Sequence, residues 1–303
     1  MYTAADIFSG CGGFSLGMQA AGFDLRWAIE RDQHAAASYR KLVGDHMSCV
    51  DVTQVDPHDF EPVDYLHASP PCQGFSSAGK RDPNDVRNSL WQEVIRFAAV
   101  LKPKIITLEN VPGMLTSGAH LDIIAALEGV GYSCQWRKLD AAWYGVPQHR
   151  KRVIIVATLP GYRYQWPMPT HAAKPDMFSP SPYVVIDGFV DMSLPCNYAN
   201  GITVTAALAG LKRPGIPPCK LGRPAYTIVA TPAHPSGNWL RLPQGFRGMT
   251  IQEGGAFQGF SASQVAALAG NVSSHWRQIG NAVPVGLAAV VASSARKGLE
   301  VTS

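Results

Sequence analysis

Short apolar runs alternate with amphipathic stretches over the first 160 residues of the chain. The apolar runs that predict β-strands are residues 4–8, 25–29, 63–68, 104–108 and 153–157. Between them, helical spacing of apolar side chains predicts a helix through residues 14–18 and another over residues 88–101. The last strand is an unbroken run rich in β-branched residues, which is typical of a strand covered on both faces. This alternation predicts an α/β fold with a doubly wound, mostly parallel sheet.

The pattern changes between residues 161 and 245, where helical periodicity almost vanishes. Thirteen of the chain's 23 prolines lie in this segment, which also carries seven Lys or Arg residues against three Asp. A loop-rich, cationic segment suits contact with a polyanion, although a lid or an ordinary small lobe would have the same composition.

Helical patterns return towards the end of the chain, at residues 261–268 and 284–295, with a turn predicted at residues 278–281. The chain is therefore expected to form a main domain and a smaller loop-rich domain. The expected main domain consists of residues 1–160 and 262–303, and the smaller one of residues 161–261.

The composition of the 303 residues, 46% hydrophobic and 16% charged, indicates a globular protein with a substantial core. There is no apolar stretch of membrane-spanning length and no secretion signal, so a cytoplasmic protein is expected. Six scattered cysteines without a Cys-x-x-Cys pair or a His/Cys cluster predict neither disulfides nor a bound metal. The net charge of +4 allows a nucleic-acid partner without requiring one.

Cys72 is the most informative residue, because it follows two prolines and precedes Gln-Gly in the run Ala-Ser-Pro-Pro-Cys-Gln-Gly-Phe-Ser. Such a rigid setting suits an exposed nucleophile better than a core cysteine. Glu109, at the end of the fourth apolar run, could polarise whatever the thiol attacks. The pair is only suggestive on its own, since a lone Cys is usually buried and a lone Glu usually solvated.

A glycine-rich turn follows the first predicted strand, in the run Asp-Ile-Phe-Ser-Gly-Cys-Gly-Gly-Phe that begins at Asp6. Glycines there let the backbone approach a ligand and present its N–H groups. Glu30, after the second strand, could bind two ribose hydroxyls, while Asp51 and Val52 could contact an adenine. The turn lacks a phosphate-binding Lys, so an adenosine without phosphates is favoured, and S-adenosylmethionine fits. Taken alone, Asp51 could equally be a solvated residue of a turn.

Taken in order, these residues resemble the motifs of the DNA (cytosine-5) methyltransferase family. The matching segments are residues 6–17, Glu30, Asp51, residues 70–73, 109–111 and 148–152, Glu253 with residues 258–260, and residues 278–284. The resemblance implies a Rossmann-like class I methyltransferase domain with a small target-recognition domain. It implies S-adenosylmethionine as cofactor, S-adenosylhomocysteine as product, and double-stranded DNA as substrate. A cognate restriction endonuclease is a functional partner in some such systems, and a monomer is expected.

The family resemblance also assigns residues to roles. The implied catalytic set is Cys72, Glu109, Arg150 and Arg152. The implied cofactor site comprises Phe8, Ser9, Gly10, Cys11, Gly12, Gly13, Glu30, Arg31, Asp51, Val52, Pro71, Leu90, Asn281 and Ala282. The implied DNA contacts are Gln73, Ser76, Lys80, Arg81, Arg87 and Arg223.

The chemistry that the resemblance implies is covalent. Cys72 would add to C6 of a cytosine flipped out of the duplex, and the methyl group would go to C5. Glu109 would act at N3 and Arg152 at O2, with Arg150 supporting the closed active-site loop. Two alternatives stay open, an RNA methyltransferase on the same scaffold and a catalytically silent binding protein. A nicotinamide dehydrogenase is disfavoured, because nothing besides the glycine-rich turn supports hydride chemistry.

Two positions depart from the family pattern. Gln252 precedes Glu253 where the family usually has Arg, which leaves the support of the small domain in question. Arg31 stands where the family often has an aromatic residue over adenine, so Val52 and Phe8 would have to supply the apolar contact.

Overall fold

The computed structural model describes residues 1–71, 89–194, 218–230, 238–243 and 245–300. Its residues group into two compact units. The first unit consists of Met1–Leu139, Lys151–Pro167 and Ala288–Ser303, and the second of Asp140–Arg150 and Met168–Leu287. The second unit thus holds residues 140–150 and 262–287, which the sequence pattern groups with the main domain.

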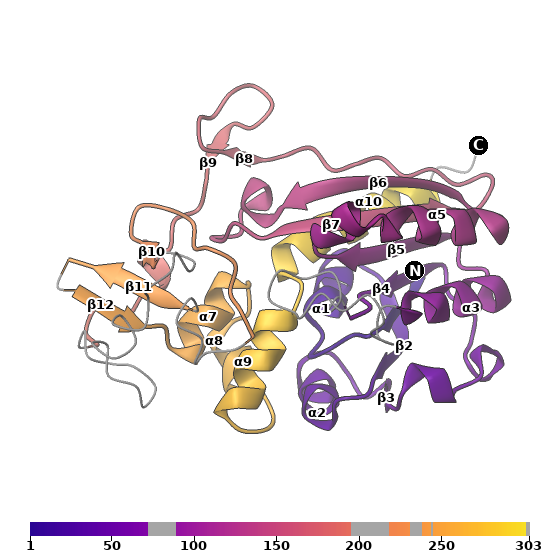
Figure 1. Ribbon diagram of the computed structural model, residues 1–303, viewed down its shortest axis with the longest axis horizontal. Coiled ribbons are helices and arrows are strands. Elements are labelled where there is room, and N and C mark those ends of the chain that lie inside the picture. The colour runs from indigo at the N-terminus through magenta and orange to yellow at the C-terminus, as the bar shows by residue number, and fades with distance from the viewer. Residues whose placement is uncertain (72–88, 195–217, 231–237, 244, 301–303) are drawn as a thin grey trace. The chain divides into compact units, whose positions relative to one another are not determined.

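A seven-stranded sheet dominates the first unit, with strand order β3-β2-β1-β4-β5-β7-β6 (Figure 1). The strands are β1 Thr3–Ile7, β2 Asp24–Glu30, β3 Met47–Cys49, β4 Tyr65–Ala68, β5 Ile105–Asn110, β6 Ser133–Asp140 and β7 Lys151–Thr158. β1 to β5 pair in parallel, and β7 runs antiparallel to β5. This arrangement confirms the predicted doubly wound, mostly parallel sheet. β7 is buried from its second residue onwards, as its unbroken apolar run predicts.

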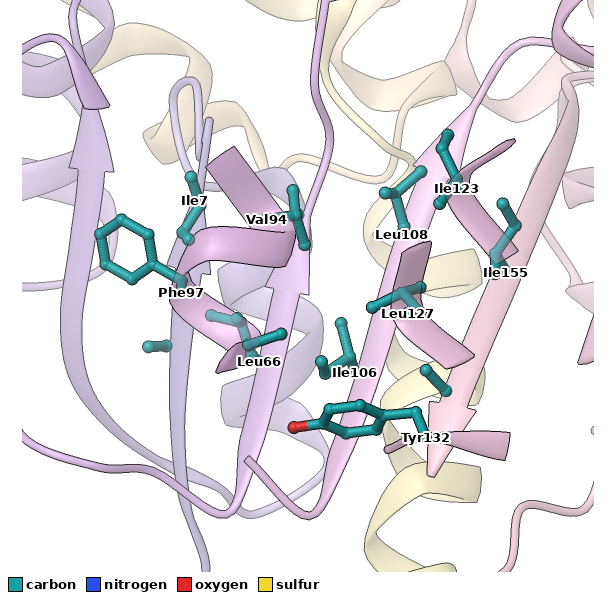
Figure 2. Packing of buried hydrophobic residues seen from close by; sticks show 14 of the residues in the cluster. Ile7, Leu66, Val94, Phe97, Ile106, Leu108, Ile123, Leu127, Tyr132 and Ile155 are labelled. Carbon is teal, nitrogen blue, oxygen red and sulfur yellow. The ribbon is translucent and has the colours of Figure 1, made fainter. Parts of the chain in front are cut away.

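Helices cover both faces of this sheet. They are α1 Gly13–Ala20, α2 Gln33–Leu42, α3 Trp91–Leu101, α4 Gly113–Ser117, α5 Ala119–Gly129 and α10 Val285–Glu300. Figure 2 shows Val94 and Phe97 of α3 and Ile123 and Leu127 of α5 among apolar side chains of the strands. Side chains alternate between faces along a strand, so Leu66 points to this apolar face, whereas Tyr65 and His67 point to the opposite one.

The second unit is built from short elements. Its strands are β8 His171–Ala172, β9 Ser181–Pro182, β10 Cys219–Lys220, β11 Trp239–Leu242 and β12 Gly245–Gly248, and its helices are α7 Ile251–Phe257, α8 Ala262–Ala266 and α9 Val272–Asn281. Within the described part of residues 161–245 there is no α-helix, as the loss of periodicity predicts.

The turn predicted at residues 278–281 is wrong, because these residues form the last helical turn of α9. Asn271 caps the start of the helix by accepting a hydrogen bond from the Ser274 amide at 2.9 Å, and Trp276 and Ile279 bury its apolar face. The chain leaves the helix only at Ala282, shortly before Pro284. The Gly-Asn pair suggests a turn locally, but the burial of the helix face overrides that preference.

The segment Val272–Glu300 is apolar and long enough to cross a membrane by composition, with a mean hydropathy of 1.3. In the structure, 61% of that apolar window is buried within the protein, as in a core helix.

Candidate active site

The parallel strands of the first unit end at one edge of the sheet, and most of the candidate residues of this unit lie there. The glycine-rich turn follows β1, Glu30 ends β2, Pro70 and Pro71 follow β4, and Glu109 lies near the end of β5. Ligands of doubly wound sheets bind beyond the carboxyl ends of the strands. The fold therefore brings these chain-distant segments to the edge where a ligand site is expected.

The glycine-rich turn is tied to Glu30. The Gly10 amide donates to Glu30 Oε2 at 3.0 Å, and the Asp32 amide donates to Oε1 at 2.7 Å. Phe8 and Gly10 both have positive φ, 61° and 57°, so the chain bends sharply away from the strand. Burial raises the pKa of the Glu30 carboxyl against the lowering effect of these hydrogen bonds.

The turn fits an adenosine with a free ribose. Among the described residues, no atom lies within 4 Å of the place where a Cβ on Gly10 would be, so the described part of the chain leaves the backbone there open to close approach. The Glu30 carboxylate has about four acceptor sites, so it can bind a ribose hydroxyl in addition to the backbone N–H groups that donate to it. The side chains of Ser9 and Cys11 are buried, so they pack into the protein rather than towards a ligand at the surface of the turn. Gly12 and Gly13 lead into α1.

Asp51 and Val52 form the next candidate segment. Asp51 caps a short 3-10 turn, and hydrogen bonds from the Thr53 amide and hydroxyl lower the pKa of its carboxyl. The guanidinium of Arg31 lies 3.6 Å from the Asp51 carboxylate; the Arg31 side chain is exposed and the Asp51 side chain is partly buried. Val52 is only 4% exposed and packs into the main core cluster, so little of its side chain is open to a ligand.

Arg96 of α3 holds the backbone of this segment, a role that the sequence pattern did not reveal. Its guanidinium donates to the carbonyl oxygens of Val52 and Val55, each at 2.7 Å. It also pairs with Glu93, one turn earlier on α3. An Arg on an amphipathic helix usually faces water, so the sequence offers no sign of this contact.

Glu109 and Arg152 form an ion pair at the end of the sheet, with Arg152 Nε 2.7 Å from Glu109 Oε1. Each side chain is about a tenth exposed, at 9% and 10%. The register explains the contact: Glu109 lies opposite Ile154, and Arg152 is two residues away on the same face of β7. The structure therefore brings two members of the predicted catalytic set together in a nearly dry setting.

The segment before the candidate nucleophile is also tied to β5. The Asn110 side-chain amide donates to the carbonyl oxygen of Pro70 at 3.2 Å, and its side-chain oxygen accepts from the Val111 amide at 2.8 Å. Cys72 and the predicted DNA contacts Gln73, Ser76, Lys80, Arg81 and Arg87 lie outside the described residues. Leu90 precedes α3, and its side chain is half-buried.

Arg150 is buried in the second unit and contacts backbone there. Its guanidinium donates to the carbonyl oxygens of Ile228 at 3.1 Å and Gly280 at 2.9 Å. Gln148 adds to this network by donating to the Gln258 side chain at 3.0 Å and accepting from the Ile228 amide at 2.8 Å. These contacts hold the end of α9 and residue 228 against the start of the unit, which suits a positioning role for Arg150.

The remaining predicted site residues lie at the surface of the second unit or near it. Asn281, the last residue of α9, is exposed, and Ala282, which caps the helix, is 9% exposed. Arg223 has an exposed side chain, and its backbone carbonyl accepts a hydrogen bond from the Ile186 amide at 3.2 Å. Among the described residues, no group of three His, Cys, Asp or Glu side chains could hold a metal ion.

Gln252 stands beside Glu253 where the family usually has Arg, and in this structure Arg247 of β12 pairs with Glu253. The Arg247 guanidinium binds both carboxylate oxygens of Glu253, one of them at 2.8 Å, and neither side chain is more than 3% exposed. Glu253 also closes a capping box with Thr250 at the start of α7. An arginine six residues before the glutamate thus forms a buried ion pair with Glu253, although the position directly before Glu253 holds Gln252.

The comparisons with known proteins agree with the motif order. Residues 2–196 match the family model described as C-5 cytosine-specific DNA methylase. The type II methyltransferase M.NgoPII of Neisseria gonorrhoeae is 30% identical over 97% of this chain and 95% of its own length. The type II methyltransferase M.AgeI of Thalassovita gelatinovora is 38% identical over 55% of this chain, and the alignment spans only 42% of M.AgeI.

The fold is also similar to that of a solved methyltransferase structure. The crystal structure of the S. pombe Dnmt2 methyltransferase superimposes with a TM-score of 0.80 over 99% of both chains, at 19% sequence identity. At that identity the likeness concerns the fold.

Proposed function

Because the chain belongs to the C-5 cytosine-specific DNA methylase family, we propose that it methylates C5 of cytosine in duplex DNA, with S-adenosylmethionine as methyl donor. The observation that carries the proposal is the Glu109–Arg152 pair, a carboxyl and a guanidinium 2.7 Å apart at the carboxyl edge of the sheet. Glu30 and the open glycine-rich turn lie along the same edge.

Cys72 supplies the nucleophile in this proposal. C5 of cytosine is a poor nucleophile, so the thiolate first adds to C6, forming a carbon–sulfur bond. The electrons of the C5–C6 double bond are then available at C5. After methylation, loss of the C5 proton and departure of the Cys72 thiolate restore the aromatic ring. A free thiol with a pKa near ~8.5 is mostly protonated at neutral pH, so the site must favour the thiolate.

Glu109 and Arg152 act on the opposite side of the base. Addition at C6 pushes negative charge onto N3 and O2 of the ring. Glu109 holds a proton at N3, and the Arg152 N–H groups not engaged with Glu109 bind O2. Because both side chains are about nine-tenths buried, their interaction with this charge is stronger than it would be in water.

The cofactor is held by the turn and the strand ends. In this proposal the Gly10 region receives the adenosine, Glu30 binds its ribose hydroxyls, and the Asp51 carboxylate accepts a hydrogen bond from the adenine amino group. When bound, S-adenosylmethionine supplies a methyl group on an electrophilic sulfonium. The chain's own residues exclude water and orient the donor, but they provide no phosphate contact in the turn, which fits a cofactor that has no phosphate.

The second unit is proposed to read the DNA sequence. Its cationic, loop-rich composition suits phosphate contact, and Arg223 presents an exposed guanidinium. Relatives of this chain are named type II methyltransferases, so a place beside a restriction endonuclease in the bacterial cytoplasm is part of the proposal. The protein is proposed to act as a monomer.

The proposal is tested by transfer of labelled methyl from S-adenosylmethionine to duplex DNA and, in parallel, to transfer RNA. Cys72→Ser is the matched variant, and Cys134→Ser, at a half-buried cysteine of the edge strand β6, is the control. We expect label on DNA that Cys72→Ser abolishes and Cys134→Ser leaves unchanged. Label on RNA alone would replace the DNA substrate by RNA, and bound cofactor without any transfer would point to a silent binding protein.

A further inference from the structure

A chain of polar side chains crosses the face of the sheet opposite to the apolar cluster of Figure 2. The Tyr65 hydroxyl lies 2.6 Å from Thr107 Oγ1, and Thr107 Oγ1 lies 2.8 Å from His67 Nδ1. His67 Nε2 in turn lies 2.9 Å from Ser69 Oγ. Tyr65, His67 and Thr107 are fully buried, so the two hydrogen bonds to Thr107 form inside the protein, and the His67–Ser69 bond is partly buried.

The imidazole of His67 is neutral within this series of hydrogen-bonded side chains. Burial lowers the pKa of its imidazole well below the ordinary value. One ring nitrogen of a neutral imidazole donates and the other accepts, and both are used here, towards Thr107 on one side and Ser69 on the other. The ring therefore bridges two hydroxyls on neighbouring segments without carrying a charge.

The ring of His67 is also fixed from above. Phe14 of α1 stacks on it with ring centroids 3.2 Å apart and an interplanar angle of 2°. Phe14 directly follows the last glycine of the candidate cofactor turn. His67 thus lies where the start of α1, β4 and β5 meet.

These hydrogen-bonded side chains lie close in sequence to the proposed catalytic residues. Ser69 lies three residues before Cys72, and Thr107 lies two residues before Glu109 on the same face of β5. The Asn110–Pro70 hydrogen bond is a second link between the same two segments. Positions facing a helix-covered sheet are ordinarily apolar, and burying polar groups there costs free energy unless each is paired. We therefore expect this network to fix the relative position of the Ser69 and Thr107 segments rather than to add to the free energy of unfolding.

We propose that His67 is a positioning residue: through Thr107 and Ser69 it fixes the segment that leads into the nucleophile relative to the strand that carries Glu109. The inference rests on the proposed function, because it assigns Cys72 and Glu109 their roles. No proton moves through the chain; the hydrogen bonds set the register and direction of residues 69–71.

The test compares variants that break the chain with variants that keep it. Thr107→Val removes the hydroxyl at almost unchanged shape, and Thr107→Ser keeps the hydroxyl. Ser69→Ala breaks the last link, and His67→Gln replaces the ring by a side chain that can donate and accept. Ile106→Val, on the apolar face of the same strand, is the control for a packing defect.

Two readouts are needed: kcat and KM for methyl transfer, and the rate of covalent complex formation with DNA containing 5-fluorocytosine, which traps the thiol adduct because fluorine cannot leave as a cation. We expect Thr107→Val and Ser69→Ala to lower kcat and the trapping rate about tenfold or more, since small misplacements of reacting groups cost up to about 100-fold. KM for S-adenosylmethionine should change less than twofold. Thr107→Ser should keep most of the wild-type kcat. The double variant Thr107→Val/Ser69→Ala should have a kcat no lower than that of the slower single variant.

Some outcomes would overturn the inference. If Thr107→Val and Ser69→Ala lose unfolding free energy as Ile106→Val does but keep the wild-type kcat and trapping rate, the network is merely structural. If the wild-type protein forms no trapped complex and transfers no methyl group, the proposed function fails, and the positioning role fails with it. A trapped wild-type complex together with unaltered variants rejects the positioning role alone.

Discussion

Glu109 of β5 and Arg152 of β7 form an ion pair between two antiparallel neighbouring strands of the mostly parallel sheet, with 2.7 Å between Oε1 and Nε. β7 reverses direction, so the start of this strand, and with it Arg152, meets the end of β5. The one antiparallel strand pair that involves β5 therefore creates the acid–guanidinium site.

The carboxyl of Glu109 is predicted to be required for the chemical step. Glu109→Gln keeps the shape but cannot supply a proton at N3, so kcat should fall about 10²- to 10⁴-fold, the usual range for general acid–base groups. Single-turnover methyl transfer measures this, and calorimetric titration should show unchanged binding of S-adenosylmethionine. Glu128→Gln, at an exposed glutamate of α5, should leave both unchanged. A Glu109→Gln enzyme with wild-type kcat would contradict the assigned role.

The buried Arg247–Glu253 pair is predicted to be indispensable for the stability of the second unit. Removing one partner leaves a buried charge without compensation, so Arg247→Met or Glu253→Gln should each cost about 3–5 kcal/mol of unfolding free energy. Denaturant titration followed by tryptophan fluorescence measures the loss. Arg26→Met is the matched control, because the pair of Arg26 with Glu61 is exposed to solvent and should contribute little to stability. Equal losses for the two arginine variants would contradict the prediction.

Asp6 is predicted to make stability fall with rising pH. Burial raises the pKa of its carboxyl from 3.8 to about 8, although the Ser15 hydroxyl donates a hydrogen bond to it. Between these two values the folded protein holds a proton that the unfolded chain has released, so the contribution of Asp6 decreases as pH rises through this window. Asp6→Asn removes that dependence.

The measurement for Asp6 is the difference in unfolding free energy between Asp6→Asn and wild type at pH 5, 6, 7 and 8. The difference should shift steadily in favour of the variant as pH rises. Asp122→Asn, at an exposed position of α5, should show a constant difference. A constant difference for Asp6→Asn as well would mean that the folded protein carries an ionised Asp6 throughout.

Gly17 is predicted to be required for the packing of α1 against α10. A Cβ on Gly17 would lie 2.5 Å from the Cβ of Ala288 and 2.6 Å from the backbone nitrogen of residue 289. Gly17→Ala should therefore cost about 1–3 kcal/mol, as overpacking does. Gly129→Ala, at the end of α5 where no described atom lies within 4 Å of the Cβ position, should instead stabilise by about 0.4–1 kcal/mol. Thermal unfolding of the two variants measures the opposite signs.

The sequence predicted the parts of the fold that are dictated by local pattern. β1, β2, β4, β5 and β7 each contain a short, mostly apolar run, and the helix before β5 has clear spacing. β6 was not predicted, because it is a sheet-edge strand with exposed residues such as Trp136 and Arg137 and so lacks an apolar run. The turn predicted at residues 278–281 was wrong, because tertiary burial of α9 decides its conformation.

The contacts within the candidate site could be predicted only in part. The order of motifs indicates that Glu109 and Arg152 serve one site, but their ion pair depends on strand register, which the sequence does not display. The roles of Arg96 and Arg247 depend on which backbone and carboxylate groups lie beside them in three dimensions. The bridging position of His67 likewise arises only when β4 and β5 are paired.

The most direct test of the central claim identifies the methylated atom. Duplex DNA is incubated with the protein and S-adenosylmethionine, digested to nucleosides and analysed by mass spectrometry against standards. We predict that 5-methyl-2′-deoxycytidine forms, and that it is absent when Cys72→Ser replaces the wild type. Methyl groups on an exocyclic nitrogen of cytosine or adenine, or 5-methyl-2′-deoxycytidine formed equally by Cys72→Ser, would contradict this prediction.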